Sequence, residues 1–107
     1  MYVQVNSTSW GLAPCVLMER DDFTTFHVSA AAGDDVAFIE KCLESISAGH
    51  SADGDHVFIS IEWLLENAPA RDYAWRKQFD DMVSFARSKG WLSSDGLAIQ
   101  AHIKRVG

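Results

Sequence analysis

The sequence predicts one α+β domain, in which a mainly antiparallel sheet of four to five strands carries three helices packed on one face. Three observations lead to this fold class. The chain has 107 residues, of which 48% are hydrophobic, and this is enough for a single core. Strand-forming runs dominate the first third of the chain, and amphipathic helical patterns follow. Strands and helices do not alternate regularly, as they do in parallel folds, so we expect residues 1–107 to form one compact α+β domain.

The first third contains three runs that are rich in β-forming residues, at 2–6, 12–18 and 23–29. Short polar segments separate these runs and are typical of turns. We therefore expect two or three antiparallel strands here. Pro14 lies inside the second run and cannot donate a hydrogen bond to a neighbouring strand, so it is expected at a sheet edge or a bulge.

Residues 34–48 form an amphipathic helix in this interpretation. Asp35 lies in the first turn, where a carboxylate favours the positive end of the helix dipole, and Gly49 is placed to end the helix. A polar loop over 50–55 then leads to a short strand at 56–59. The apolar stripe of the helix has helical spacing and consists of Val36, Ile39, Cys42, Leu43 and Ile46.

Two further helices follow the 56–59 strand. Ser60 can cap a helix that begins at Ile61 and ends at Pro69, because its hydroxyl can accept a hydrogen bond from a free amide of the first turn. A longer helix is expected over 72–89, with Gly90 as its left-handed C-cap. Its apolar stripe is the strongest periodic signal in the chain and consists of Trp75, Phe79, Met82, Val83 and Ala86.

The C-terminal segment has the pattern of a hairpin. Trp91 and Leu92 can begin a strand, residues 93–96 can form a turn, and residues 97–104 alternate. The alternation predicts that Leu97, Ile99, Ala101 and Ile103 point inward and that Ala98, Gln100, His102 and Lys104 point outward.

The net charge is −6, from 15 acidic and 9 basic residues. The excess lies in residues 1–50, which hold seven acids against Arg20 and Lys41. Binding to nucleic acid needs clustered basic residues, so we expect no nucleic acid partner, although the second half has the outline of a winged helix. A basic protein partner for an acidic face remains open. No apolar run is long enough to cross a membrane, and the first residues lack a secretory leader, so we expect a cytoplasmic protein without membrane contact.

Cys15 and Cys42 are the only cysteines, and both lie in apolar stretches. Their spacing matches neither a redox pair nor a zinc site. In a reducing compartment, two free and buried thiols are favoured over a disulfide.

Histidine is the usual general base near neutral pH, so the histidines are the first candidates for catalysis. His27 and His102 lie at outward positions of predicted strands, and if these strands are neighbours the two imidazoles can meet as a proton-transfer pair. The alternative is two separate surface histidines. His56 is a third candidate, and Asp55 or Glu62 could orient one of the three rings.

Four potential metal ligands lie close together between His50 and His56. Their spacing matches no zinc pattern, and the glycine position required by a calcium loop is occupied by His56. An ordinary turn at 53–55 is the favoured interpretation, so we expect no metal and no cofactor. The candidates for the alternative are His50, Asp53, Asp55 and His56.

Two of the four tryptophans are candidates for partner binding. Trp63 falls on the flank of its predicted helix, and Trp10 lies in a polar stretch. A half-exposed indole provides a large contact area at a small entropic cost.

No nucleophile elbow, phosphate-binding loop or metalloprotease motif occurs in the sequence. The leading hypothesis is therefore a small binding or regulatory module that acts through protein contacts, as a homodimer or on a basic partner. The alternative is a small enzyme or ligand-binding protein with a histidine-containing pocket between the sheet and the helices.

Overall fold

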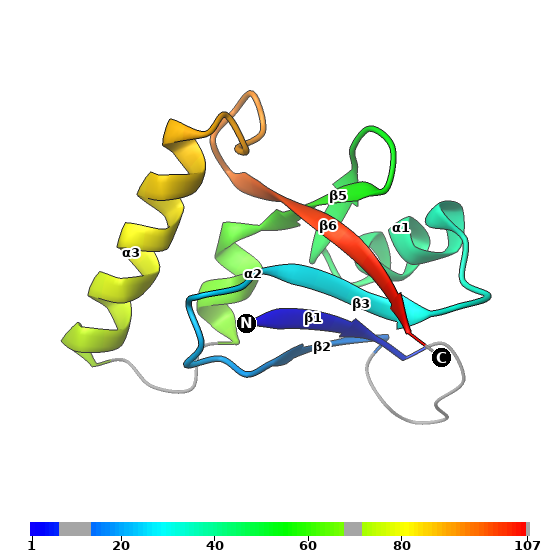
Figure 1. Ribbon diagram of the computed structural model, residues 1–107, viewed down its shortest axis with the longest axis horizontal. Helices are drawn as coiled ribbons and strands as arrows, with labels where there is room; N and C mark the ends of the chain where they lie inside the picture. The colour runs from blue at the N-terminus through cyan, green and yellow to red at the C-terminus, as the bar shows by residue number, and fades with distance from the viewer. Residues whose placement is uncertain (7–13, 68–71, 107) are drawn as a thin grey trace.

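A curled six-stranded sheet runs through the centre of the structure, a computed structural model that describes residues 1–6, 14–67 and 72–106. The described residues also form three helices, which lie around this sheet (Figure 1). The predicted α+β class is therefore confirmed. The strands lie in the order β2-β1-β3-β6-β5-β4. They are β1 (Tyr2–Val5), β2 (Cys15–Met18), β3 (His27–Ala31), β4 (Gly49–Ser51), β5 (His56–Ser60) and β6 (Ala98–Val106).

The sheet is mixed, so the expectation of four to five mainly antiparallel strands is wrong in part. β3 pairs in parallel with both of its neighbours, β1 and β6, while the other three pairings are antiparallel. The reason is the connection between β2 and β3, which carries the chain past β1 and places β3 on its far side. β2 is an edge strand, and Pro14 lies in a bend directly before it, as its missing N–H requires.

Each helix begins at a polar side chain that accepts a hydrogen bond from a first-turn amide. The three helices are α1 (Val36–Ser45), α2 (Ile61–Glu66) and α3 (Tyr73–Ser88). The capping residues are Asp35, Ser60 and Asp72. Such caps satisfy backbone donors that have no partner inside the helix. Among the described residues, no helix has the length and apolar character needed to span a membrane.

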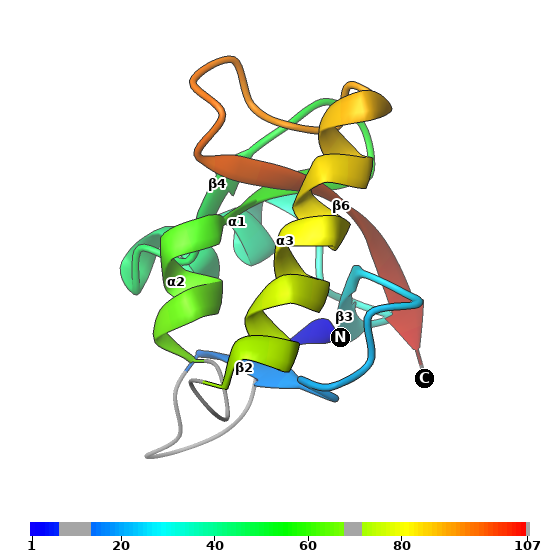
Figure 2. The same cartoon turned by 90° about the vertical axis from the view of Figure 1, so that its left-hand side faces the viewer.

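The helices are not all on one face of the sheet, as the sequence had led us to expect. α1 and α2 cover one face, whereas α3 lies across the end of the strands (Figure 2). α3 is held there through the β2–β3 connection, because Trp75 Nε1 donates to the Arg20 carbonyl at 2.9 Å and Phe23 packs edge-on against Trp75. Within the described part of the chain, the opposite face of the sheet therefore has no helix over it.

The core forms where the inward strand residues meet α1, α2 and the inner side of α3. Phe79 and Ile39 are fully enclosed there, as the helical periodicity predicts. Cys15 is buried and Cys42 partly buried, and both are free thiols. The largest completely buried side chains are Phe79, Met1, Ile39, Leu43, Ile59, Leu64, Val3, Val28 and Val57.

Residues 49–51 form the edge strand β4, not part of the predicted loop. A three-residue polar strand carries too little alternation to be detected in sequence. Gly49 does not end α1, since the left-handed residue after that helix is Ser47, with φ 56°. Gly49 is instead required by close packing, because a Cβ at this position would collide with the backbone carbonyl of Phe58 on β5.

The C-terminal hairpin is confirmed only in part. Gly90 has φ 75°, as expected of a left-handed C-cap. Leu92 makes an isolated bridge to Ile99 and does not begin a strand. Leu97 is 68% exposed and Ala98 is buried, opposite to the prediction, whereas Ile99, Ala101 and Ile103 point inward as predicted. The turn at 93–96 is the cause, because Leu97 still belongs to it: its amide donates to the side chain of Asp95.

Candidate functional site

Five side chains form a row across the face of the sheet that no helix covers. The pairing register sets this row, because each residue lies beside the next on a neighbouring strand. In order from β2 to β5, the row consists of Met18, Tyr2, His27, His102 and His56. We call these five residues the cross-sheet row.

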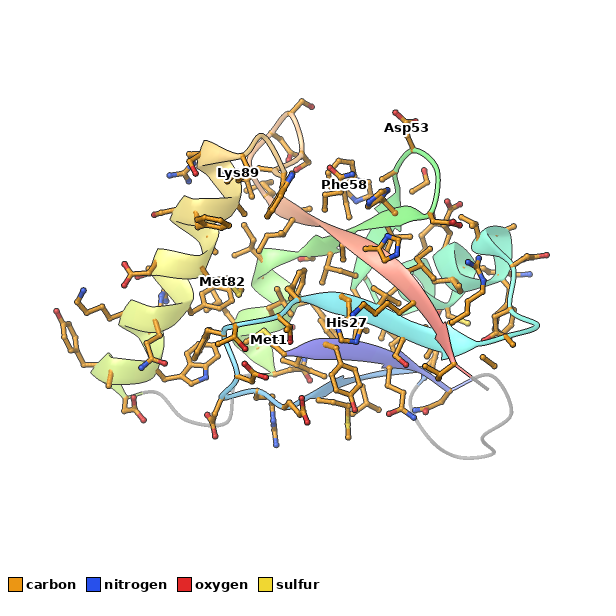
Figure 3. All side chains as sticks on the ribbon, in the orientation of Figure 1. Met1, His27, Asp53, Phe58, Met82 and Lys89 are labelled. Atoms are coloured by element: carbon orange, nitrogen blue, oxygen red, sulfur yellow. The ribbon has the colours of Figure 1, made fainter. Side chains whose placement is uncertain are left out.

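The cross-sheet row brings three of the four histidines together. His27 and His102 are partners in the parallel register of β3 and β6, so the first of the two alternatives left open by the sequence, neighbouring strands, is the one observed. His56 joins them from β5, with its ring centroid 5.3 Å from that of His102 and the rings at 64°. Tyr2 stacks on His27 with centroids 5.0 Å apart. Figure 3 shows the position of His27 on β3.

His27 is partly buried within this row. Its Nδ1 atom is buried and has no hydrogen-bond partner among the described residues. Burial lowers the pKa of His27, and the positive charges of Lys104 and the N-terminal ammonium lower it further, as does His102, while Glu19 opposes them. The ring is therefore neutral at pH 7.

A cavity of about 330 Å³ lies beside the row, at the place where α3 meets the sheet. The β2–β3 connection, the C-terminal half of α3 with the segment after it, and the strands β5 and β6 form its walls. Figure 3 shows Met82 on the side of α3 that is turned toward the strands. The apolar lining consists of Phe23, Phe26, Met82, Phe85, Ala86, Trp91 and Ile99, and the polar lining of Thr24, Thr25, His56, Gln100 and His102.

The N-terminus holds the β2–β3 wall of the cavity in place. The Met1 ammonium donates to the carbonyl oxygens of Asp22, at 2.6 Å, and of Thr25, at 3.2 Å. The Asp22 carboxylate in turn accepts from the hydroxyl and the amide of Thr24, and these hydrogen bonds lower its pKa. The segment is thus ordered by local polar contacts rather than by strand pairing.

His56 is oriented by the backbone, not by a carboxylate. Its Nδ1 lies 3.3 Å from the carbonyl oxygen of Asp53, and Nε2 has no hydrogen bond within the described chain. Asp55 pairs with Arg105 at 3.3 Å, and Glu62 is exposed in the first turn of α2. Neither acid orients a histidine ring, so the expected role of Asp55 or Glu62 is not supported by a contact.

The potential metal ligands between His50 and His56 do not converge. His50 packs against the ring of Phe58, with centroids 5.2 Å apart, while Asp55 faces Arg105. In residues 1–6, 14–67 and 72–106, no group of three or more His, Cys, Asp or Glu side chains is placed to hold a metal ion.

The expected exposure of Trp63 is wrong. Its indole is 8% exposed, because α2 is short and turns this side toward the core. Trp10 lies outside the described residues. Trp91 is the tryptophan exposed beside the cavity, at 44%, and packs edge-on against Phe85. Trp91 and Phe85 were not predicted as site residues from the sequence. Phe85 falls outside the apolar stripe of its helix, and this position indicates that its ring does not pack in the core.

The acidic excess of residues 1–50 is divided between separate places in the fold. One group, with Glu19 and Asp21, lies in the β2–β3 connection, and another, with Asp34 and Asp35, lies between β3 and α1. Figure 1 shows these connections at opposite ends of the sheet. The charge asymmetry along the chain therefore does not correspond to one acidic face.

Comparison with protein-family models, with curated proteins and with solved structures found no match. The chemistry of the site thus follows from its own residues. Aromatic and aliphatic side chains can enclose an apolar molecule, and the imidazoles of His56 and His102 with the amide of Gln100 can hydrogen-bond to a polar group on it.

Proposed function

We propose that this protein binds a small, largely apolar molecule in the cavity between α3 and the β5–β6 strands. The observation that carries the proposal is the lining, which combines seven apolar side chains with a few polar groups, including two histidines. Sites for small molecules have this composition, and a volume of about 330 Å³ lies within their usual range.

The same lining favours binding over hydrolysis or group transfer. Among the described residues, the cavity presents no cysteine, serine or carboxylate, and no histidine is hydrogen-bonded to the hydroxyl of Thr24 or Thr25 to activate it as a nucleophile. The histidines can exchange protons with a bound molecule, but they lack a carboxylate that would orient them for catalysis. Binding is the function that these groups can perform without a further partner.

The test is titration of the ¹⁵N-labelled full chain with small aromatic probes that are neutral, anionic or cationic. We expect at least one probe to shift the amide resonances of residues 23–26 and 99–102, which border the cavity. Met82→Trp should abolish these shifts by filling the cavity, while Ser84→Trp, exposed on the same helix, should leave them intact. If no probe of any charge shifts the bordering amides, the proposal is wrong.

A second candidate is the protein-contact module, and the exposure of three large side chains favours it. Phe85, Trp91 and Leu97 are 56%, 44% and 68% exposed. Exposed aromatic side chains are enriched in protein interfaces. Light scattering of the wild type and of Phe85→Ser tests self-association: a dimer that this substitution dissociates supports the candidate, and a monomer at all concentrations contradicts it.

A further inference from the structure

We infer that the molecule bound in this cavity is an uncharged, flat aromatic compound whose hydroxyl or N–H group donates a hydrogen bond to Nε2 of His56. This inference rests on the proposed binding function and specifies the chemical class of the ligand. Three features of the lining support it: its aromatic rings, its lack of charged side chains and the orientation of one imidazole.

The aromatic rings favour a flat ligand. Four of the lining side chains are aromatic hydrocarbons or indole: Phe23, Phe26, Phe85 and Trp91. They come from the β2–β3 connection and from α3 with the segment after it. Aromatic rings that line a cavity can contact a planar molecule through offset stacking or edge-on packing, and each such pair adds to the stabilisation from burial alone.

The lining also favours a ligand without charge. Among the described residues that line the cavity there is no Asp, Glu, Lys or Arg. A charged group that enters an apolar site loses its hydration, and the loss is compensated only where an opposite charge is available. Lys89 Nζ lies 5.5 Å from the centroid of the Phe85 ring, but Lys89 is not one of the lining residues.

His56 determines the direction of the hydrogen bond. When the neutral imidazole donates from Nδ1 to the Asp53 carbonyl, the proton resides on Nδ1 and Nε2 is an acceptor. Within the described chain nothing donates to Nε2. A ligand with an O–H or N–H group can donate to Nε2, whereas an ether or a ketone cannot.

Three probes of nearly equal shape separate these features. At pH 8, 2-naphthol is neutral and carries a donor, 2-methoxynaphthalene is neutral and has none, and 2-naphthoate is an anion. We expect 2-naphthol to bind tightest, 2-methoxynaphthalene about tenfold more weakly and 2-naphthoate at least tenfold more weakly, because one lost hydrogen bond and one unpaired charge each have this effect. Dissociation constants come from the amide shifts of residues 23–26 and 99–102.

His56→Phe tests the donor–acceptor pair directly. The substitution should weaken the binding of 2-naphthol about tenfold and leave the affinity for 2-methoxynaphthalene unchanged. The unchanged affinity also shows that the cavity is intact. His50→Phe is the matched control, since His50 packs on Phe58 and does not line the cavity, and it should affect neither probe.

Two results would overturn the inference and leave the binding function standing. One is 2-naphthoate binding as tightly as 2-naphthol, which contradicts the uncharged ligand. The other is an equal loss of affinity for both neutral probes in His56→Phe, which contradicts the hydrogen bond to Nε2 of His56. Failure of all probes to shift the cavity amides would instead overturn the proposed function itself.

Discussion

His56 and His102 face each other across the antiparallel β5–β6 pair, with ring centroids 5.3 Å apart. These two histidines belong both to the cross-sheet row and to the cavity wall. They therefore connect the uncovered face of the sheet with the hollow beneath α3. This geometry depends on the stability of the strands and helices that surround the two histidines.

Gly49→Ala should destabilise the protein by about 2 kcal/mol, measured by urea denaturation. The added Cβ would collide with the backbone carbonyl of Phe58, and a backbone atom in a paired strand cannot move aside easily. Gly33→Ala is the control, because a Cβ at Gly33 meets no atom within 4 Å, and it should change the free energy of unfolding by less than about 0.5 kcal/mol. Equal effects of the two variants would contradict the close contact between β4 and β5.

Phe79→Ala should destabilise the protein by about 3 to 5 kcal/mol, the usual cost of emptying a buried aromatic site. Phe79 is 1% exposed and stacks on Trp75. Tyr73→Ala on the same helix removes a ring that is 82% exposed and should have an effect below about 0.5 kcal/mol. A small effect of Phe79→Ala in chemical denaturation would show that α3 does not pack on the core.

Stability should fall as the pH drops below about 6.5, and His27 should account for part of the fall. Its pKa is lowered in the folded state, mainly by burial, so the unfolded chain binds more protons than the folded chain in this range. The contribution is complete above pH 6.5 and is lost as the pH falls through the folded pKa. Thermal unfolding at pH 5.0 to 7.5 should show a shallower pH dependence in His27→Gln. An unchanged slope would rule out this role, and the carboxylates Asp22 and Asp95, whose pKa values are also lowered, act only at lower pH.

Native Cys15 should react more slowly than Cys42 with a thiol reagent at pH 8. Burial raises the pKa of Cys15 to about 12, so almost no thiolate is present, and the side chain is 3% exposed. Cys42 is only partly buried, and its pKa is raised as well. The variants Cys42→Ala and Cys15→Ala each leave one thiol for rate measurements. Rapid labelling of Cys15 in folded Cys42→Ala, together with slow labelling of Cys42 in folded Cys15→Ala, would contradict the buried position of Cys15.

The helices show how far the sequence determines structure by itself. Apolar spacing places α1 and α3 within two or three residues of their observed ends, and Ser60 caps α2 as its hydroxyl predicts. Helix signals are contained within one segment, because the hydrogen bonds and the apolar stripe involve residues close together in the chain. The same holds for the left-handed turn at Gly90.

Strand partners depend on residues far apart in the chain. Alternation of apolar and polar residues gives the outward direction of His27 and His102. The same alternation occurs whether β3 runs parallel or antiparallel to its neighbours, so it does not predict the pairing. The passage of the β2–β3 connection past β1 decided that β3 pairs with β1 and β6 in parallel. That topology placed His27 beside His102 and left α3 across the end of the sheet.

The sequence therefore determined the α+β class, the helices, the Ser60 cap and the outward direction of His27 and His102 as separate facts. Only the tertiary structure decided that these histidines form one row and that two of them border a cavity with Phe85 and Trp91. The physical reason is that periodicity records which side of an element is buried. It does not record which element covers that side, because the choice depends on the packing of the whole chain.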